Sequence, residues 1–135
     1  MRRAVLIDIT QPQVLDLTLL VDEVEIIHKK YQGQHPDILF SLDKFIKQNN
    51  LKLDKISYLV LLEGQGSFSG VRQAAAILNT IHLIKKINIF GLDVRKYPSR
   101  EQIIRAIQKE ARKKHGFLKP IYSGEPNITY PSNKK

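Results

Sequence analysis

A glycine-rich segment between two apolar stretches is the part of the chain that most directly suggests chemistry. The segment runs from residue 63 to residue 72, and its marked members are Gly64, Gly66, Ser67, Phe68, Ser69, Gly70 and Arg72. Glycines permit positive φ angles and close backbone approach, and free N–H groups at a helix start can bind an anion. The spacing fits neither a Walker A loop nor the dinucleotide fingerprint. The alternative is a tight structural turn that holds no ligand.

Three carboxylates form a second candidate group. Asp8, Glu63 and Asp93 each stand at or just beyond the end of an apolar run. If those runs are neighbouring strands, the three strand ends lie along one sheet edge, where nucleases of the ribonuclease H type hold Mg²⁺ with carboxylates. Aspartates are also common at strand ends without any such role. The alternative function is therefore a Mg-dependent ribonuclease H-like nuclease that uses these three residues.

Positive charge is concentrated in the last third of the chain. Residues 95–135 contain 11 Lys/Arg and 3 Asp/Glu, whereas residues 1–94 contain 11 and 10. The densest cluster consists of Lys109, Arg112, Lys113, Lys114 and Lys119. Such a cluster can contact the phosphates of an RNA, although a solvated helix face is an equally good explanation. The four histidines show no metal-ligand spacing.

The elements that position these residues follow from hydrophobic periodicity. Strands are predicted at 3–9, 14–20, 24–31, 56–62 and 87–92, and helices at 36–49, 70–84 and 99–115. Pro36 suits the first turn of the first helix, Ser99 with Gln102 forms a capping box, and Gly116 ends the third helix. The order β-β-β-α-β-α-β-α predicts an α/β fold with a mixed five-stranded sheet and helices on its faces. This is the ribonuclease H-like order, which is also the half-unit of actin-like ATPases.

We expect one domain over residues 1–118 and an extended basic tail over residues 119–135. The chain has 135 residues, a formal net charge of +9 and no cysteine, which excludes disulfides and Cys-ligated zinc. The residues after Met1 are too charged for a signal peptide, and no apolar run is long enough to span a bilayer. These features predict a soluble, cytoplasmic protein.

Several segments together resemble the TsaB (YeaZ) family. The run from Gly64 to Arg72, Gly-x-Gly-Ser-Phe-Ser-Gly-Val-Arg, is similar to the family's Gly-Pro-Gly-Ser-Phe-Thr-Gly-Leu/Val-Arg. The opening strand resembles the family's Leu-Ala-Ile-Asp-Thr-Ser, and 119–129 its C-terminal end. Gln65 and Ser69 depart mildly from the family pattern, while the stretch 9–11 departs from it after the first aspartate. The family's second actin-like domain has no counterpart in this sequence.

The resemblance implies a role without catalysis. TsaB-like proteins are actin-like partners of TsaD, which transfers the threonylcarbamoyl group to the adenosine next to the tRNA anticodon, and TsaE, an ATPase, joins the complex. The resemblance therefore implies a TsaD-like partner, a TsaE-like ATPase in the same complex, and tRNA reached through that complex. It implies no catalytic residue, metal or cofactor in this chain. We also expect no ATP cleft between two lobes within it.

The resemblance also implies that the helices at 36–49 and 70–84 contact TsaD. The residues that carry over to this interface are Leu39, Leu42, Val71, Ala75, Leu78 and His82. We expect the second helix to divide its residues between the partner and its own sheet, and that division is left open here. Helix faces exposed for a partner can also self-associate, which allows a homodimer.

Overall fold

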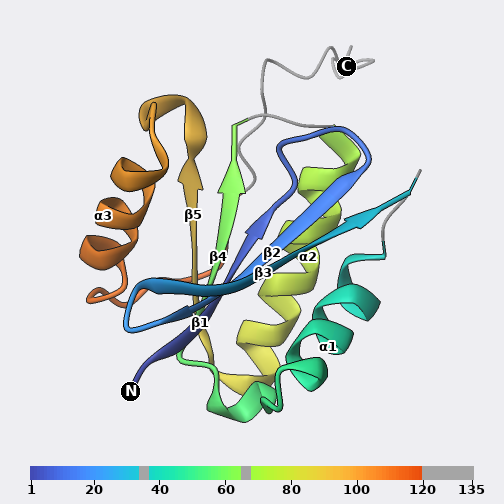
Figure 1. Ribbon diagram of the computed structural model, residues 1–135, viewed down its shortest axis with the longest axis vertical. Helices are drawn as coiled ribbons and strands as arrows, with labels where there is room; N and C mark the ends of the chain where they lie inside the picture. The colour runs from blue at the N-terminus through green and yellow to red at the C-terminus, as the bar shows by residue number, and fades with distance from the viewer. Residues whose placement is uncertain (34–36, 65–67, 120–135) are drawn as a thin grey trace, which may run out of the picture.

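The computed structural model describes residues 1–33, 37–64 and 68–119, without the side chains of Phe68 and Ser69. The elements are β1 (Arg3–Asp8), β2 (Val14–Val21), β3 (Val24–Gln32), α1 (Ile38–Gln48), β4 (Tyr58–Glu63), α2 (Phe68–Lys85), β5 (Asn88–Asp93) and α3 (Arg100–Glu110), with two short 3₁₀ turns, η1 (Leu53–Lys55) and η2 (Val94–Lys96). This order confirms the predicted β-β-β-α-β-α-β-α succession (Figure 1).

The five strands form one mixed sheet in the order β3-β2-β1-β4-β5. Strands β1, β2 and β3 are antiparallel neighbours, while β4 lies parallel to both β1 and β5. The carboxyl ends of β1, β4 and β5 therefore meet at one edge of the sheet, and their amino ends meet at the opposite edge. These two edges carry the features discussed below.

Helices cover both faces of the sheet, as Figure 1 shows. Helices α1 and α2 pack on the face that carries Val5, Leu17 and Leu61. Helix α3 packs on the other face through Ile103 and Ile107. Strand β4, covered on both sides, is buried along its whole length, as expected for a central strand between two helical layers.

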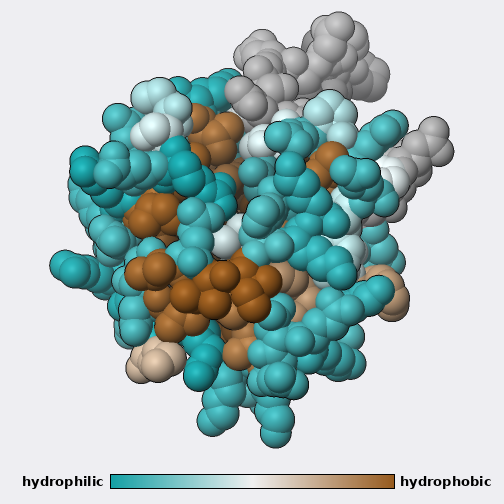
Figure 2. Space-filling view, in the orientation of Figure 1, coloured by the Kyte–Doolittle hydropathy of each residue, from teal (hydrophilic) through white to brown (hydrophobic). Residues whose placement is uncertain are grey.

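Strand β3 is one of the two outermost strands of the sheet, with β5 on the opposite side, and almost all side chains of β3 are exposed. Figure 2 shows a hydrophobic patch across the middle of the visible face, and Val24, Ile26 and Ile27 of β3 are among the exposed apolar residues of the chain. A bulge interrupts the β2–β3 pairing next to Leu19. Exposed charge and bulges are both devices that limit edge-to-edge pairing, and Lys29 and Lys30 supply the charge at the other end of β3.

The helix ends differ partly from the prediction. The Asp37 side chain caps α1 by accepting a hydrogen bond from the Phe40 amide at 2.9 Å, while Pro36 lies outside the described residues. Ser99 caps α3 as predicted, since its Oγ accepts from the Gln102 amide at 3.2 Å. However, α3 ends at Glu110 rather than near Gly116. The backbone beyond it bonds to the side chain of Asn88 instead of continuing the helix.

Among the described residues, no helix combines the length and the apolar character that crossing a bilayer requires.

Candidate functional site

The glycine-rich segment joins β4 to α2 at the carboxyl edge of the sheet. Gly64 directly follows β4 with a φ of +97°, and a Cβ built on it would overlap the carboxylate of Asp93. Both observations explain why glycine stands there. Helix α2 begins at Phe68, two residues earlier than predicted, so Ser69, Gly70 and Arg72 belong to its first turns. Gly66 and Ser67 lie outside the described residues, and the role of the whole segment stays a prediction.

The three candidate carboxylates lie at this edge but not together. Glu63 pairs with Asp93 across β4 and β5, whereas Asp8 pairs with Leu62. Because side chains alternate between the faces of a strand, Asp8 lies on the α3 side, with Leu6 and Leu62. Glu63 and Asp93 follow the other parity. In the described part of the chain no three His, Asp or Glu residues gather into a metal-binding group. This arrangement does not support the alternative of a Mg-dependent nuclease that uses Asp8, Glu63 and Asp93.

Each of these carboxylates already serves the local structure. Asp8 accepts from the Thr10 amide at 2.8 Å and from the Thr10 hydroxyl. Asp93 accepts from Nε and Nη2 of Arg95, both at 2.9 Å, and this guanidinium lowers the pKa of Asp93. Glu63 is 1% exposed, and a Cβ on Gly91 would overlap its carboxylate. The glycines at 64 and 91 thus make room for two carboxylates on neighbouring strands.

Most of the predicted partner interface lies inside the protein. Leu42, Val71, Ala75 and Leu78 are buried in this chain alone, so they cannot meet a partner without a rearrangement. Ala74, Leu78 and Ile81 of α2 belong to the core cluster on the sheet, so this part of the stripe packs inside the protein. His82 is half-buried, and its Nδ1 lies 2.7 Å from the Ile87 carbonyl oxygen. Of the six residues, Leu39 is the exposed one, at 54%.

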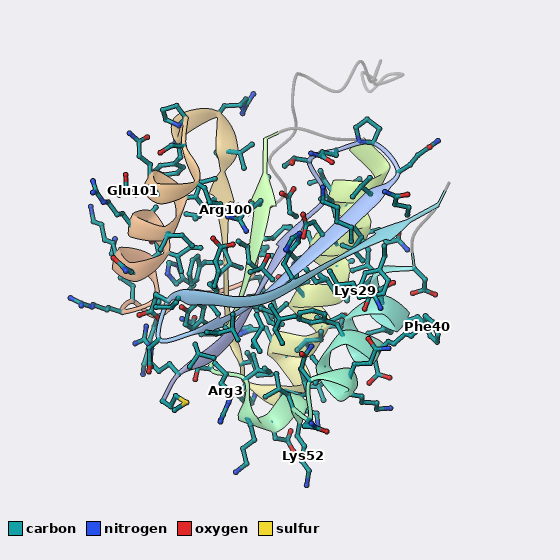
Figure 3. All side chains as sticks on the ribbon, viewed as in Figure 1. Arg3, Lys29, Phe40, Lys52, Arg100 and Glu101 are labelled. Carbon is teal, nitrogen blue, oxygen red and sulfur yellow. The ribbon has the colours of Figure 1, made fainter. Side chains whose placement is uncertain are left out.

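Other apolar side chains on the helices are exposed instead. Phe40 on α1 is exposed and points away from the body of the protein in Figure 3. Leu83 and Ile84 are exposed near the end of α2. These side chains do not belong to the rows of buried residues on their helices. Their departure from the helical spacing of the core residues is the feature of the sequence that could have identified them as exposed.

A groove of about 600 Å³ runs beside α1. It is mainly apolar and is lined by Leu39, Leu42, Asp43, Ile46, Lys47, Asn50, Leu51, Lys52, Leu53 and Ile81. An ion pair between Lys85 and Asp54, at 3.2 Å, ties the end of α2 to η1 next to it. The groove is therefore lined by residues of α1 and, through Ile81, of α2, the two helices that were expected to carry the interface.

The predicted basic cluster is divided by the structure. Arg112, Lys113 and Lys114 line one pocket at the amino edge of the sheet. Lys109 lines a different hollow, together with Lys96 of η2 and further residues of α3. Lys119 lines a third hollow, beside Glu63 and Gly91. Whether any of these residues contacts RNA stays a prediction.

A polar group on the α3 face surrounds Arg100. Its guanidinium lies between α3 and the sheet (Figure 3) and donates to Glu25 at 2.6 Å and to the Thr18 hydroxyl at 3.2 Å. Asp16 lies on the same face, and within the described residues its Oδ1 is buried without a hydrogen-bond partner. Burial raises the pKa of Asp16, and nearby positive charges offset this only in part.

Replacing Asp16 with Asn should stabilise the protein at pH 7. A carboxyl group whose pKa is raised by folding favours the folded state when it is protonated. Its contribution to stability is fully present below the ordinary pKa of an aspartate, about 4, and is lost as the pH rises through the pKa of the group in the folded protein. Because Asn does not ionise, the variant avoids that loss. Melting temperatures measured from pH 3.5 to 7 should show a gain that shrinks toward the acid end. Asp43→Asn on exposed α1 is the control, and an equal gain there would contradict the explanation.

Comparison with known proteins gives a fold but not a family. No family model matches the chain, and no curated protein matches it. Among solved structures it is similar to YeaZ from Pseudomonas aeruginosa, with a TM-score of 0.60 and 14% identity over 75% of this chain and 51% of that one. It is also similar to an uncharacterized protein with similarity to peptidase YEAZ from Pseudomonas aeruginosa. Here the TM-score is 0.60 and the identity 14%, over 75% of this chain and 50% of that one.

These likenesses confirm the ribonuclease H-like, actin-like α/β fold. At such low identity they extend no further than the fold, which by itself does not determine function. The chain spans about half the length of the two structures that it resembles.

Proposed function

We propose that this protein is a TsaB-like subunit without catalytic activity, which binds and supports a TsaD-like protein in tRNA threonylcarbamoyladenosine modification. A TsaE-like ATPase belongs to the same complex, and tRNA is reached through it. One observation carries the proposal: the TsaB-like glycine-rich segment joins β4 to α2 within a fold that resembles YeaZ.

The chemistry of the carboxyl edge is consistent with an accessory role. Asp8 and Asp93 are engaged with Thr10 and Arg95, and Glu63 is buried. A general acid or base must lie within reach of the proton that it transfers. The Glu63 carboxylate is enclosed against Gly91 and is poorly placed for this. The observed geometry thus favours structural over catalytic duties for these carboxylates.

We place the partner contact at the groove beside α1 instead of on the predicted residues of α2 that are buried, Val71, Ala75 and Leu78. The groove combines an apolar lining with Leu39 at its rim, and amphipathic helices characteristically bind in such grooves by their apolar side chains. Lys52 among the lining residues suits an acidic residue on the partner helix, whereas Lys47 is already paired with Asp43 at 3.0 Å. The proposed occupant is an amphipathic helix of the TsaD-like protein.

Co-purification with the TsaD-like protein of the same organism tests the function. We expect the wild type to form a complex that survives size-exclusion chromatography. Leu39→Asp should weaken it about tenfold or more, because the new carboxylate would lose its hydration against an apolar partner surface. Calorimetric titration measures the change. Ile26→Asp on β3 is the matched control, since Ile26 is 53% exposed against 54% for Leu39.

Two results would count against this proposal in different ways. Equal weakening by both variants would move the contact away from the groove but leave the partnership. A wild-type protein that binds no TsaD-like protein, together with unchanged threonylcarbamoyladenosine levels in a deletion strain, would exclude the function itself.

A further inference from the structure

A second hollow lies at the amino edge of the sheet, opposite the glycine-rich segment. Its volume is about 440 Å³, and it is lined by Arg2, Ser57, Tyr58, His82, Lys86, Asn88, Ala111, Arg112, Lys113, Lys114 and His115. These residues come from the starts of β1, β4 and β5, the end of α2 and the segment after α3. The hollow is thus assembled from distant parts of the chain.

The lining of this basic pocket is strongly positive. Five of its residues are Lys or Arg, and none is Asp or Glu. Two of the five are neutralised in part: Arg2 pairs with Glu23 at 3.0 Å and Lys113 with Glu110 at 3.1 Å. The other three, Lys86, Arg112 and Lys114, are exposed and form no ion pair with any described residue. The pocket therefore retains three cations without a counter-charge in the described chain.

The loop that carries these cations is held in place by Asn88. The Asn88 side-chain amide donates to the Lys113 carbonyl oxygen at 3.0 Å, and its oxygen accepts from the His115 amide at 3.0 Å. One side chain thereby fixes the backbone on both sides of Lys114. The His115 ring packs against Phe90 with centroids 4.7 Å apart, and its Nε2 lies 2.9 Å from the Glu110 carbonyl oxygen. A loop ordered in this way loses little entropy when a ligand binds.

The rings that line the pocket are those of Tyr58, His82 and His115, and the two histidine rings pack against Phe117 and Phe90. Tyr58 and Phe90 are buried, at 2% and 3% exposure, and Tyr58 donates its hydroxyl proton to Glu23 at 2.7 Å. Base recognition by stacking needs an accessible ring, whereas Lys and Arg contact phosphates without reading sequence. Three cations spread around one hollow also suit several phosphates along a strand better than a single one.

We propose that the basic pocket binds the backbone phosphates of RNA, and that Lys86, Arg112 and Lys114 provide the main contacts. This inference rests on the proposed function only in taking tRNA as the natural RNA. Binding is expected from the protein alone, without a partner. It also corrects the composition of the predicted cluster: Lys86 and Arg2 join Arg112, Lys113 and Lys114, while Lys109 and Lys119 lie in other hollows.

A local explanation competes with this one. Helices α2 and α3 both end near the pocket, and cations near a helix C-terminus stabilise its partial negative charge. That effect accounts for Lys86 and Arg112, which closely follow the two helices. It does not require Lys114 to be fixed by Asn88. The two explanations differ in what the cations support, which is RNA affinity in one case and folding stability in the other.

Fluorescence anisotropy with labelled tRNA and the full-length protein tests the proposal. The triple variant Lys86→Ala, Arg112→Ala, Lys114→Ala should bind at least tenfold more weakly at low salt. Each phosphate contact contributes roughly 0.7–0.9 to the slope of log affinity against log salt, so the slope should fall by about 2. The control removes the same charge from β3 and α1, with Lys29→Ala, Lys44→Ala and Lys47→Ala, and should change affinity much less.

Three outcomes would overturn the proposal. Equal losses in the two triple variants would show that net charge alone attracts the RNA. A triple variant that binds tRNA normally but unfolds at lower urea would assign the cations to the helix ends. Complete displacement of tRNA by low millimolar ATP would reassign the pocket to a free nucleotide. Failure here with successful co-purification of the TsaD-like protein would leave the proposed function standing.

Asn88→Ala provides a further check that leaves the charge unchanged. Without the two hydrogen bonds to the loop, affinity for tRNA should fall several-fold while the salt slope stays close to that of the wild type. An unchanged affinity would show that the ordering of the loop does not contribute to binding.

Discussion

Replacing Leu78 with Ala should lower the free energy of unfolding by about 3–4 kcal/mol. Leu78 is completely buried and belongs to the core between α2 and the sheet. Truncating a buried leucine removes apolar contacts and leaves a cavity that neighbouring residues fill only in part. Urea denaturation followed by circular dichroism measures the change, and the midpoint should shift without a change in slope.

Leu39→Ala is the matched comparison, because both leucines were predicted to contact the partner. Leu39 is 54% exposed, so its truncation should change stability by no more than about 0.5 kcal/mol while weakening the complex with the TsaD-like protein. A Leu78→Ala variant that stays as stable as the wild type but no longer binds that protein would mean that the Leu78 side chain is at the surface after all.

Gly64→Ala should cost about 2–3 kcal/mol of stability, from two causes. The φ of +97° is unfavourable for a residue with a Cβ, and such strain costs on the order of 1–3 kcal/mol. In addition, the new methyl group would overlap the carboxylate of Asp93, which Arg95 holds by two side-chain hydrogen bonds. Thermal and urea unfolding of the variant provide the measurement.

A double-mutant cycle separates the two causes. In an Asp93→Ala background the overlap with the carboxylate disappears, and Arg95, whose Nε lies 3.1 Å from the added Cβ, loses the group that holds it. The cost of Gly64→Ala should therefore drop toward the backbone component. Gly116→Ala serves as the control, since nothing lies within 4 Å of a Cβ at that position, and its effect should be close to zero. If Gly64→Ala were as harmless as Gly116→Ala, the turn would have to adopt another conformation.

The fold could be predicted because each element carries its own periodic signal. The apolar run before Glu63 predicted a strand covered on both faces, and β4 is buried throughout. Ser99 and Gln102 predicted the start of α3 through their capping pattern. The end of α3 was predicted less well, because it is determined by Asn88, a residue on β5 that bonds to the following loop. Local sequence contains no information on a contact of that kind.

The candidate site was predicted less completely, for reasons of geometry. The apolar stripe on α2 predicted an apolar helix face, but not whether that face packs on the sheet or on a partner. Leu78 belongs to the core cluster on the sheet, and Val71 is buried as well. For the carboxylates, a shared position at the strand ends does not determine a shared face. The register of β1, β4 and β5 places Asp8 and Glu63 on opposite faces of the sheet. The basic pocket requires tertiary topology, since Arg2 and Arg112 are brought together only by the sheet.

The position of β3 at the edge of the sheet has a consequence for local unfolding. Its side chains contribute almost nothing to the core, whereas those of β4 are all buried. Segments with few buried contacts open at low free energy, independently of the global transition. Strand β3 should therefore detach from β2 first, and the centre of the sheet should open last. The glycine-rich segment follows directly from β4, so the proposed family motif is attached to the most protected strand of the protein.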